Sequence, residues 1–361
     1  MSTPALPAGT PPDPLEWRRK FLERKYREDY LPELHDPFEV DGIALQPAEA
    51  LEKCRPDQYH IALTEYARRQ GEEALENACN EFPAPIAIPV YRALNSAENE
   101  LQRLFHFRDT AEAIIVVLLA VILGKCRTRG VKLTGTTFPS PRGTPETLTA
   151  RKLLTDSVAH RLAILDGLLT ALTGKADLVC IAHIPLDAVR RLSDLNDIRN
   201  DFAHYEAMTE LEAAKVCQEM QEQIADALLA FEWLAETELV TFSGAVTGKP
   251  GIAKFEVHSG STQNKNIKEP KLEGAALGRC LGIVTDHLSR PLFQCNGDVF
   301  EATPYFHTET DPRGHRRRLW LYKRRIWHSS ETEFQVIGER EIRKVTDTVA
   351  VELKVLDELF S

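Results

Sequence analysis

Four polar side chains share one short stretch of the sequence, LNDIRNDFAHYEAM, which runs from Leu195 to Met208. The stretch has the apolar spacing of a helix, although asparagine is a poor helix-interior residue because its amide competes for backbone hydrogen bonds. On a helical wheel the large apolar side chains fall on one side, and the opposite side carries Asn196, Arg199, Asn200 and His204. A merely solvated face would more commonly carry Glu, Lys and Gln, so this face indicates chemistry.

The chemistry that suits this face is phosphate chemistry. An arginine binds a phosphoryl group as a permanent, bidentate cation, and a histidine exchanges a proton near pH 7. The stretch contains no metal-ligand pattern, and RNA brings its own nucleophile, the 2′-hydroxyl. The residues therefore predict RNA cleavage without metal or cofactor. His204 is expected to be the general base or acid, Arg199 the phosphate stabiliser and Asn200 the positioning residue.

Residues 199–204, Arg-Asn-Asp-Phe-Ala-His, match RNxxxH, a common form of the RxxxxH motif of HEPN domains. The sequence resembles a bacterial HEPN group over roughly residues 85–345, with the motif as the sharp part of the likeness. The resemblance implies a helical bundle with the motif on a late helix. It also implies a metal-independent endoribonuclease that acts as a toxin or in anti-phage defence. Because some HEPN domains are inactive, the alternative is a non-catalytic scaffold or sensor subunit that mediates dimerisation in a defence complex.

The motif face also predicts an interface. Ala203 lies in its middle, where a small side chain lets another surface come close. A two-fold interface is self-complementary, so each motif would meet its own copy. We expect a homodimer through the motif helix, and the resemblance implies a composite active site there. It further implies an antitoxin or another defence-system protein as a partner.

The most basic part of the sequence is RGHRRRLWLYKRR, residues 313–325. Its cations and interleaved aromatic residues are typical of segments that bind phosphates and stack on bases. A strand with a charged outer face explains the same pattern, and the two interpretations are compatible. The residues predicted to bind RNA are Arg316, Arg317, Arg318, Lys323 and Arg324. Elsewhere, Asp109 and Glu112 precede an apolar run, and a buried carboxylate facing the motif would orient His204.

The pattern of elements predicts an α+β fold. The run AIIVVLLAVIL (113–123) indicates a central helix, and further helices are expected at about 149–173, 186–205 and 209–238, with a loop at 134–147. Six later segments indicate antiparallel strands: VTFSGAV, AKFEVHS, LGIVTD, PLFQCNGDVFEAT, LWLYKRRIWHS and EFQVIGE. The expected regions are a Pro-rich disordered tail (1–14), a helical accessory region (15–90), the HEPN bundle (91–239) and a β-rich domain with a short terminal helix (240–361).

Composition and charge narrow the setting. Residues 240–361 hold 18 Lys and Arg against 16 Asp and Glu, whereas the rest of the chain holds 26 against 38. An anionic partner such as RNA is therefore expected to meet the C-terminal part. The seven cysteines form no CxxC pair, which indicates free thiols in a reducing compartment. An apolar run of 11 residues is too short to cross a bilayer, and no signal peptide is recognisable, so we expect a cytoplasmic protein without membrane contact.

Overall fold

The chain has an α+β fold, as the sequence predicts. The computed structural model describes residues 38–40, 43–45, 56–140, 143–173, 184–193, 208–245, 253–261, 291–295, 298–310, 317–329, 331–337, 341–345 and 355–361. The chain divides into two compact units, residues 1–74 and 75–361. The expected tail, residues 1–14, lies outside the described residues.

The first unit contains a short hairpin where the sequence analysis expects helices. Strands β1 (Phe38–Val40) and β2 (Ile43–Leu45) pair antiparallel, with Val40 opposite Ile43. The signal for them was present, because an Asp-Gly dipeptide between short apolar segments is a strong hairpin pattern. The helical expectation for residues 15–90 is therefore wrong at these strands. It holds for α4 (Pro56–Glu81), which starts in this unit and ends in the second.

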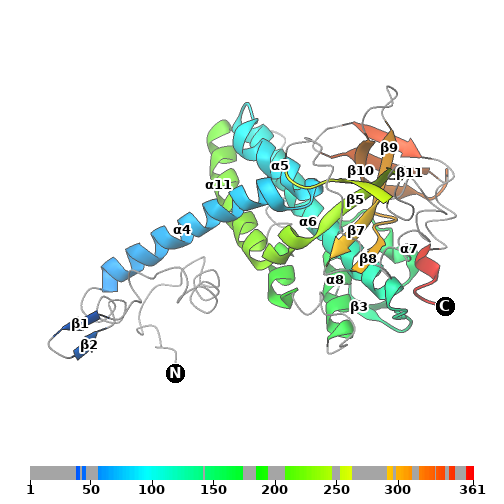
Figure 1. Ribbon diagram of the computed structural model, residues 1–361, viewed down its shortest axis with the longest axis horizontal. Coiled ribbons are helices and arrows are strands. Elements are labelled where there is room, and N and C mark those ends of the chain that lie inside the picture. The colour runs from blue at the N-terminus through cyan, green and yellow to red at the C-terminus, as the bar shows by residue number, and fades with distance from the viewer. Residues whose placement is uncertain are drawn as a thin grey trace. The chain divides into compact units, whose positions relative to one another are not determined.

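The second unit is built around the long helix α6 (Glu100–Thr128), which packs against α5 (Ala84–Asn95), α8 (Val158–Leu172) and α11 (Glu210–Ala230). Figure 1 shows α5, α6 and α11 side by side. From Thr110 to Cys126 every residue of α6 is buried, which confirms the central position predicted from its apolar run. Of the helices in the described residues, none has the length and apolarity that a membrane span requires.

Capping residues separate neighbouring helices at two places in the second unit. The chain leaves α5 at Asn95, and Asn99 caps α6 by accepting a hydrogen bond from the backbone N–H of Gln102 at 2.8 Å. The helix expected at 149–173 is instead α7 (Ala150–Leu153) followed by α8. Ser157 caps α8 because its hydroxyl accepts from the backbone N–H of His160, so the polar residues before it belong to a turn.

The chain on both sides of the RNxxxH motif is helical where the structure describes it. Residues 186–193 form a helix, and they bury Ala188, Val189 and Leu192. After the motif, Thr209 and Glu212 form a capping box that starts α11. That helix ends at Ala230, and the 3-10 helix η1 (Glu232–Glu236) leads into the first strand of a sheet.

The strands form antiparallel sheets. One sheet has the order β6-β5-β7-β8, and a second has the order β12-β11-β10-β9. Their bounds are β5 Glu238–Ala245, β6 Ala253–Val257, β7 Leu292–Cys295, β8 Asp298–Glu301, β9 Phe306–Thr310, β10 Arg317–Ile326, β11 Glu331–Val336 and β12 Ile342–Val345. The expected strand LGIVTD (281–286) lies outside the described residues. Near the C-terminus, residues 355–357 are helical.

A second two-stranded hairpin occupies the segment expected to be a loop. Strand β3 (Thr137–Pro139) pairs with β4 (Pro145–Thr147), and β3 packs against α8. Gly167 permits this approach, because a Cβ at that position would lie 2.5 Å from the Phe138 Cβ and 2.7 Å from the Thr137 carbonyl oxygen. Gly143 adopts a φ of 79° in the turn between the two strands, whereas Gly167, which permits the close approach to α8, lies outside this segment of the sequence.

Helices and sheets share one core in the second unit. The buried hydroxyls of Tyr305 and Tyr322 donate to the carbonyl oxygens of Leu153 and Leu154, at 2.8 and 2.7 Å. Trp320 is 1% exposed beside them. The segments on either side of the expected boundary at residue 239 therefore belong to one compact unit.

Candidate functional site

The three motif residues predicted to be catalytic, Arg199, Asn200 and His204, lie outside the described residues. The structure describes the segments before and after the motif, namely the helix of residues 186–193 and the capping box at Thr209 that starts α11. The expected helix is thus confirmed up to residue 193, and the helical continuation through the motif stays a prediction.

The basic stretch divides into residues with different surroundings. Arg316 lies outside the described residues, and the backbone of Arg317 and Arg318 forms the start of β10, opposite Thr310 and Glu309 of β9. Farther along the same strand, Lys323 and Arg324 are described with their side chains, and each one meets a carboxylate.

These two carboxylates neutralise part of the predicted RNA-binding surface. The Lys323 ammonium lies 2.9 Å from Glu112 Oε2, and Arg324 Nε lies 2.6 Å from Glu333 Oε2. The hydrogen bond from Arg324 lowers the pKa of Glu333, although burial opposes the shift. A cation held by a buried carboxylate offers less net charge to a phosphate.

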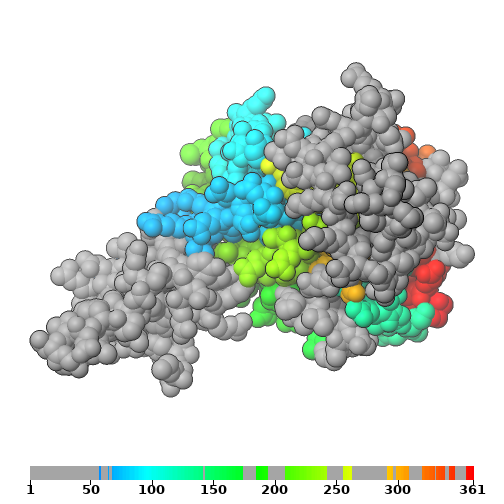
Figure 2. Space-filling view, in the orientation of Figure 1, coloured from blue at the N-terminus to red at the C-terminus, as the bar shows by residue number. Residues whose placement is uncertain are grey.

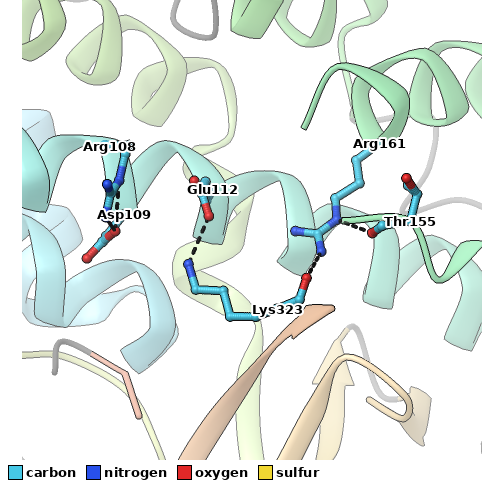
Figure 3. Close-up of polar contacts among 6 residues, drawn as sticks. All are labelled: Arg108, Asp109, Glu112, Thr155, Arg161 and Lys323. Atoms are coloured by element: carbon cyan, nitrogen blue, oxygen red, sulfur yellow. Dashed lines mark hydrogen bonds and ion pairs between the residues drawn. The ribbon is translucent and has the colours of Figure 1, made fainter. Parts of the chain in front are cut away.

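Glu112 belongs to a polar seam between the helices and the second sheet. Figure 3 shows Glu112 on α6, Lys323 on β10 and Arg161 on α8 around this seam. Arg161 is 2% exposed, and its guanidinium donates to the carbonyl oxygens of Thr155 at 3.0 Å and Lys323 at 2.8 Å. The hypothesis that Glu112 orients His204 stays a prediction, and within the described residues its carboxylate is held by Lys323.

A cleft of about 790 Å³ opens beside the first turns of α6. Its walls come from the end of α5, the N-terminal half of α6 and one residue of β11. Its rim is exposed at Ser96, Glu98 and Asn99, and Figure 2 shows the turn between α5 and α6, in cyan, at the surface. The half-buried walls carry Arg92, Phe105, His106, Arg108 and Asp109. The volume lies within the range of ligand-binding pockets.

Arg92 differs from the other charged residues that line the cleft. It is half-buried near the end of α5 and lines the cleft, yet no carboxylate among the described residues lies within ion-pairing distance of its guanidinium. A half-buried cation without a counter-charge loses favourable solvation free energy, and an anionic ligand would compensate for that loss. Arg92 is therefore the group in the cleft best placed to bind an anion.

The part of the cleft lined by α6 carries a cation over an aromatic ring. The Arg108 guanidinium lies 5.0 Å from the centre of the Phe105 ring and donates to Asp109 Oδ1 at 2.7 Å. Both contacts fix the orientation of the guanidinium plane. Amide side chains of Gln102 and Gln335 complete the lining. The cleft thus combines an unneutralised cation, a flat aromatic wall and hydrogen-bonding groups of both kinds.

Sequence reasoning missed this cleft. Its residues come from α5, α6 and β11, so the lining extends from Arg92 to Gln335 along the chain. Two local signals existed, the spacing of Gln102, Phe105 and Asp109 along one helix face and the adjacent Arg108–Asp109 pair. Neither indicates that an arginine of the preceding helix lines the same cleft.

Metal ligands do not cluster in the described part of the chain, where no three His, Cys, Asp or Glu side chains are close enough to share an ion. Comparison with models of known protein families, with curated proteins and with solved structures finds no match for this chain.

Proposed function

We propose that the protein is a metal-independent endoribonuclease of the HEPN type, acting as a toxin or an anti-phage defence effector. The observation that carries the proposal is the spacing of Arg199, Asn200 and His204 in the sequence, between two segments that the structure describes as helical, residues 186–193 and α11. The α+β fold with a long buried central helix is compatible with a bundle that presents this segment.

In the proposed reaction one His204 accepts the proton of the 2′-hydroxyl. The 2′-oxygen attacks phosphorus, the bond from phosphorus to the 5′-oxygen breaks, and a second His204 donates a proton to that oxygen. Arg199 stabilises the negative charge that develops on the phosphoryl oxygens. The products are a 2′,3′-cyclic phosphate and a 5′-hydroxyl.

The decisive experiment incubates the purified protein with single-stranded RNA in EDTA. His204→Ala should lower the cleavage rate by about 10²- to 10⁴-fold, and Arg199→Ala should lower it at least as much. Arg199→Lys should rescue in part, because lysine cannot grip phosphate as a planar fork. Asn200→Ala should cost less than either. As a matched control, His328→Ala changes an exposed histidine after β10 and should leave the rate unchanged.

Several outcomes would refute the mechanism. Products with a 5′-phosphate, cleavage of RNA with deoxyribose at the cut site, or full activity of His204→Ala would each do so. The protein would then fit better as a non-catalytic scaffold or sensor subunit. Induced expression separates the two in cells, because a toxin should arrest growth in a way that depends on His204.

The proposed composite site requires a homodimer through the motif helix. Ala203→Arg should separate the protomers and abolish cleavage, and light scattering at micromolar concentration measures the first effect. A monomer with full activity would remove the basis for the composite site. An antitoxin or defence-system partner is proposed on the HEPN resemblance alone.

The proposed RNA surface on the basic stretch has its own test. Replacing Arg316, Arg317 and Arg318 with Gln should weaken RNA binding and make its salt dependence less steep. The slope of the logarithm of the binding constant against the logarithm of the salt concentration should become shallower by about 0.7 for each lost phosphate contact. Replacing Lys323 and Arg324 should have a smaller effect, because Glu112 and Glu333 already hold them. Equal slopes in all variants would leave the stretch as the outer face of a strand.

A further inference from the structure

We propose that the cleft beside α6 binds one nucleotide of single-stranded RNA, with a phosphate at Arg92 and a base against the Phe105–Arg108 pair. The proposal deepens the ribonuclease function and rests on it, because it takes RNA as the ligand. The proposal rests on the described residues that line the cleft, and these are side chains other than Arg199, Asn200 and His204.

The charge of the lining indicates the part of the ligand that each wall meets. The positive charge of Arg108 is balanced by Asp109 at 2.7 Å, whereas Arg92 has no carboxylate partner among the described residues. A phosphate placed at Arg92 would supply the missing negative charge, and the guanidinium could hold two of its oxygens. The remaining carboxylate of the lining, Glu98, lies on the exposed rim, where water screens it.

The wall formed by Phe105 and Arg108 indicates a base. Unstacked RNA bases bind to aromatic rings and to the planes of arginine guanidinium groups. Here a ring and a guanidinium lie together with a centre-to-cation distance of 5.0 Å, and the bond to Asp109 keeps the cation in place. Both side chains are half-buried and line the cleft.

Hydrogen-bond donors and acceptors line the cleft together with this wall, and a nucleotide needs both. Gln102 accepts from the backbone N–H of Glu98 through Oε1, at 2.7 Å, which leaves its amide N–H groups to donate. The Asp109 carboxylate can accept from a ribose hydroxyl or a base amino group through its second oxygen. A purely electrostatic groove would lack such acceptors, so the lining favours a nucleotide unit over an unstructured polyanion.

The experiment measures the binding of a fluorescein-labelled ten-nucleotide single-stranded RNA by anisotropy, over a range of salt concentrations. The full-length His204→Ala variant is the background, so that cleavage does not interfere. Arg92→Gln should weaken binding by roughly 10- to 100-fold and make the salt slope shallower by about 0.7. Arg92→Lys should keep the slope.

Phe105→Leu should weaken binding by about 5- to 150-fold through the lost stacking. It should leave the salt slope unchanged, because no charge is removed. The matched control is Arg129→Gln, at the opposite end of α6 and about 30 Å from Asp109 at 1.5 Å per helical residue. It should change neither affinity nor slope.

A second surface is the main alternative site for the nucleotide. Trp327 is 40% exposed after β10, and the guanidinium groups of Arg151 and Arg325 lie 4.6 and 5.6 Å from its ring centre. If Trp327→Leu weakens binding while Phe105→Leu does not, the nucleotide lies there and the proposal is overturned. AMP that binds as tightly as the ten-nucleotide RNA would also overturn it, by making a free nucleotide the ligand.

Cleavage assays of the same substitutions with His204 present separate this proposal from the proposed function. RNA binding that depends on Arg92 and Phe105, in a protein that cleaves nothing, supports the cleft and refutes the nuclease. Cleavage together with RNA binding that neither substitution alters refutes the cleft alone. Absence of RNA binding by both the His204→Ala variant and the unaltered protein overturns the cleft as an RNA site.

Discussion

Basic side chains at or beside the two ends of α6 have different surroundings. At the C-terminal end, Lys125 Nζ lies 2.6 Å and Arg129 Nη2 2.8 Å from Asp298 Oδ2, while Arg127 lies 3.1 Å from Glu301. At the N-terminal end, Arg92 of the neighbouring helix lines an open cleft and forms no ion pair with a described residue. The same residue types thus hold β8 against the helix at one end and face an open cleft at the other.

The difference shows how a structural cation can be told from a ligand-binding one. Lys125 is 4% exposed, and it also donates to the Cys295 carbonyl oxygen at 3.3 Å, so its charge is satisfied within the protein. Removing a satisfied, buried cation leaves a carboxylate without its partner. Removing Arg92 would leave no such group among the described residues. Stability should therefore depend on the C-terminal end, and RNA binding on the N-terminal end.

The largest effect on stability is expected from Lys125→Ala. Breaking a buried ion pair costs about 3–5 kcal/mol, and Arg129 still holds Asp298, so we expect a loss near the lower value. Urea unfolding followed by tryptophan fluorescence measures it. Lys125→Ala combined with Asp298→Ala should cost less than the sum of the single changes. A loss in Lys125→Ala below about 1 kcal/mol would make the cluster a surface feature and remove the contrast.

A steric change at the same end should have the next largest effect. Gly124 lies where α6 meets β8, and a Cβ there would overlap the Phe300 ring and lie 3.1 Å from the Glu301 carbonyl oxygen. Gly124→Ala should therefore cost about 1–3 kcal/mol through overpacking. Phe300→Leu in the same chain should recover part of the loss by freeing space. An unaltered unfolding midpoint would show that β8 is not fixed against the helix.

The C-terminal end of α6 was easier to predict from the sequence than the cleft. The buried run of α6 could be read from the sequence because eleven consecutive apolar residues fit no exposed helix. Most strands of the two sheets could be read from β-branched and aromatic residues between turn residues. Strands β9 and β12 were missed, since FHTET and IRKV are polar, and each is held by pairing with a neighbouring strand rather than by its own pattern.

The candidate sites differ in the same way. The motif at Arg199, Asn200 and His204 is visible in the sequence because helical spacing alone places these residues on one face. The cleft depends on long-range packing, since only the fold brings Gln335 of β11 into the same lining as Arg92 and Phe105. The pairing of Glu112 with Lys323, 211 positions apart, was hidden for the same reason, so Lys323 was expected to be freer than it is.

Acid should weaken the C-terminal end through Asp298. Burial alone would raise the pKa of this carboxyl, but hydrogen bonds from Lys125 and Arg129 outweigh it and lower the pKa below its usual value. A depressed folded-state pKa contributes stability above the unfolded value, about 3.9, and the contribution is lost as the pH falls through the folded value. The stability gap between the unaltered protein and Asp298→Asn should therefore narrow below about pH 4. A gap that stays constant down to about pH 2 would show that the ion pair contributes nothing.

The smallest effect on stability, and the most informative, is expected from Arg92→Gln. With no ion pair to a described residue, its loss should change the free energy of unfolding by no more than about 0.5 kcal/mol, whereas Arg127→Gln breaks a bond to the 7% exposed Glu301 and should cost about 1–3 kcal/mol. Both variants lose one arginine beside α6, so net charge cannot explain a difference between them in urea unfolding. If Arg92→Gln destabilises the protein as much as Arg127→Gln does, Arg92 supports the fold, and its half-buried charge no longer points to a ligand. If stability is unchanged while RNA binding weakens and its salt slope falls, the cation is held in the cleft for a partner outside the chain.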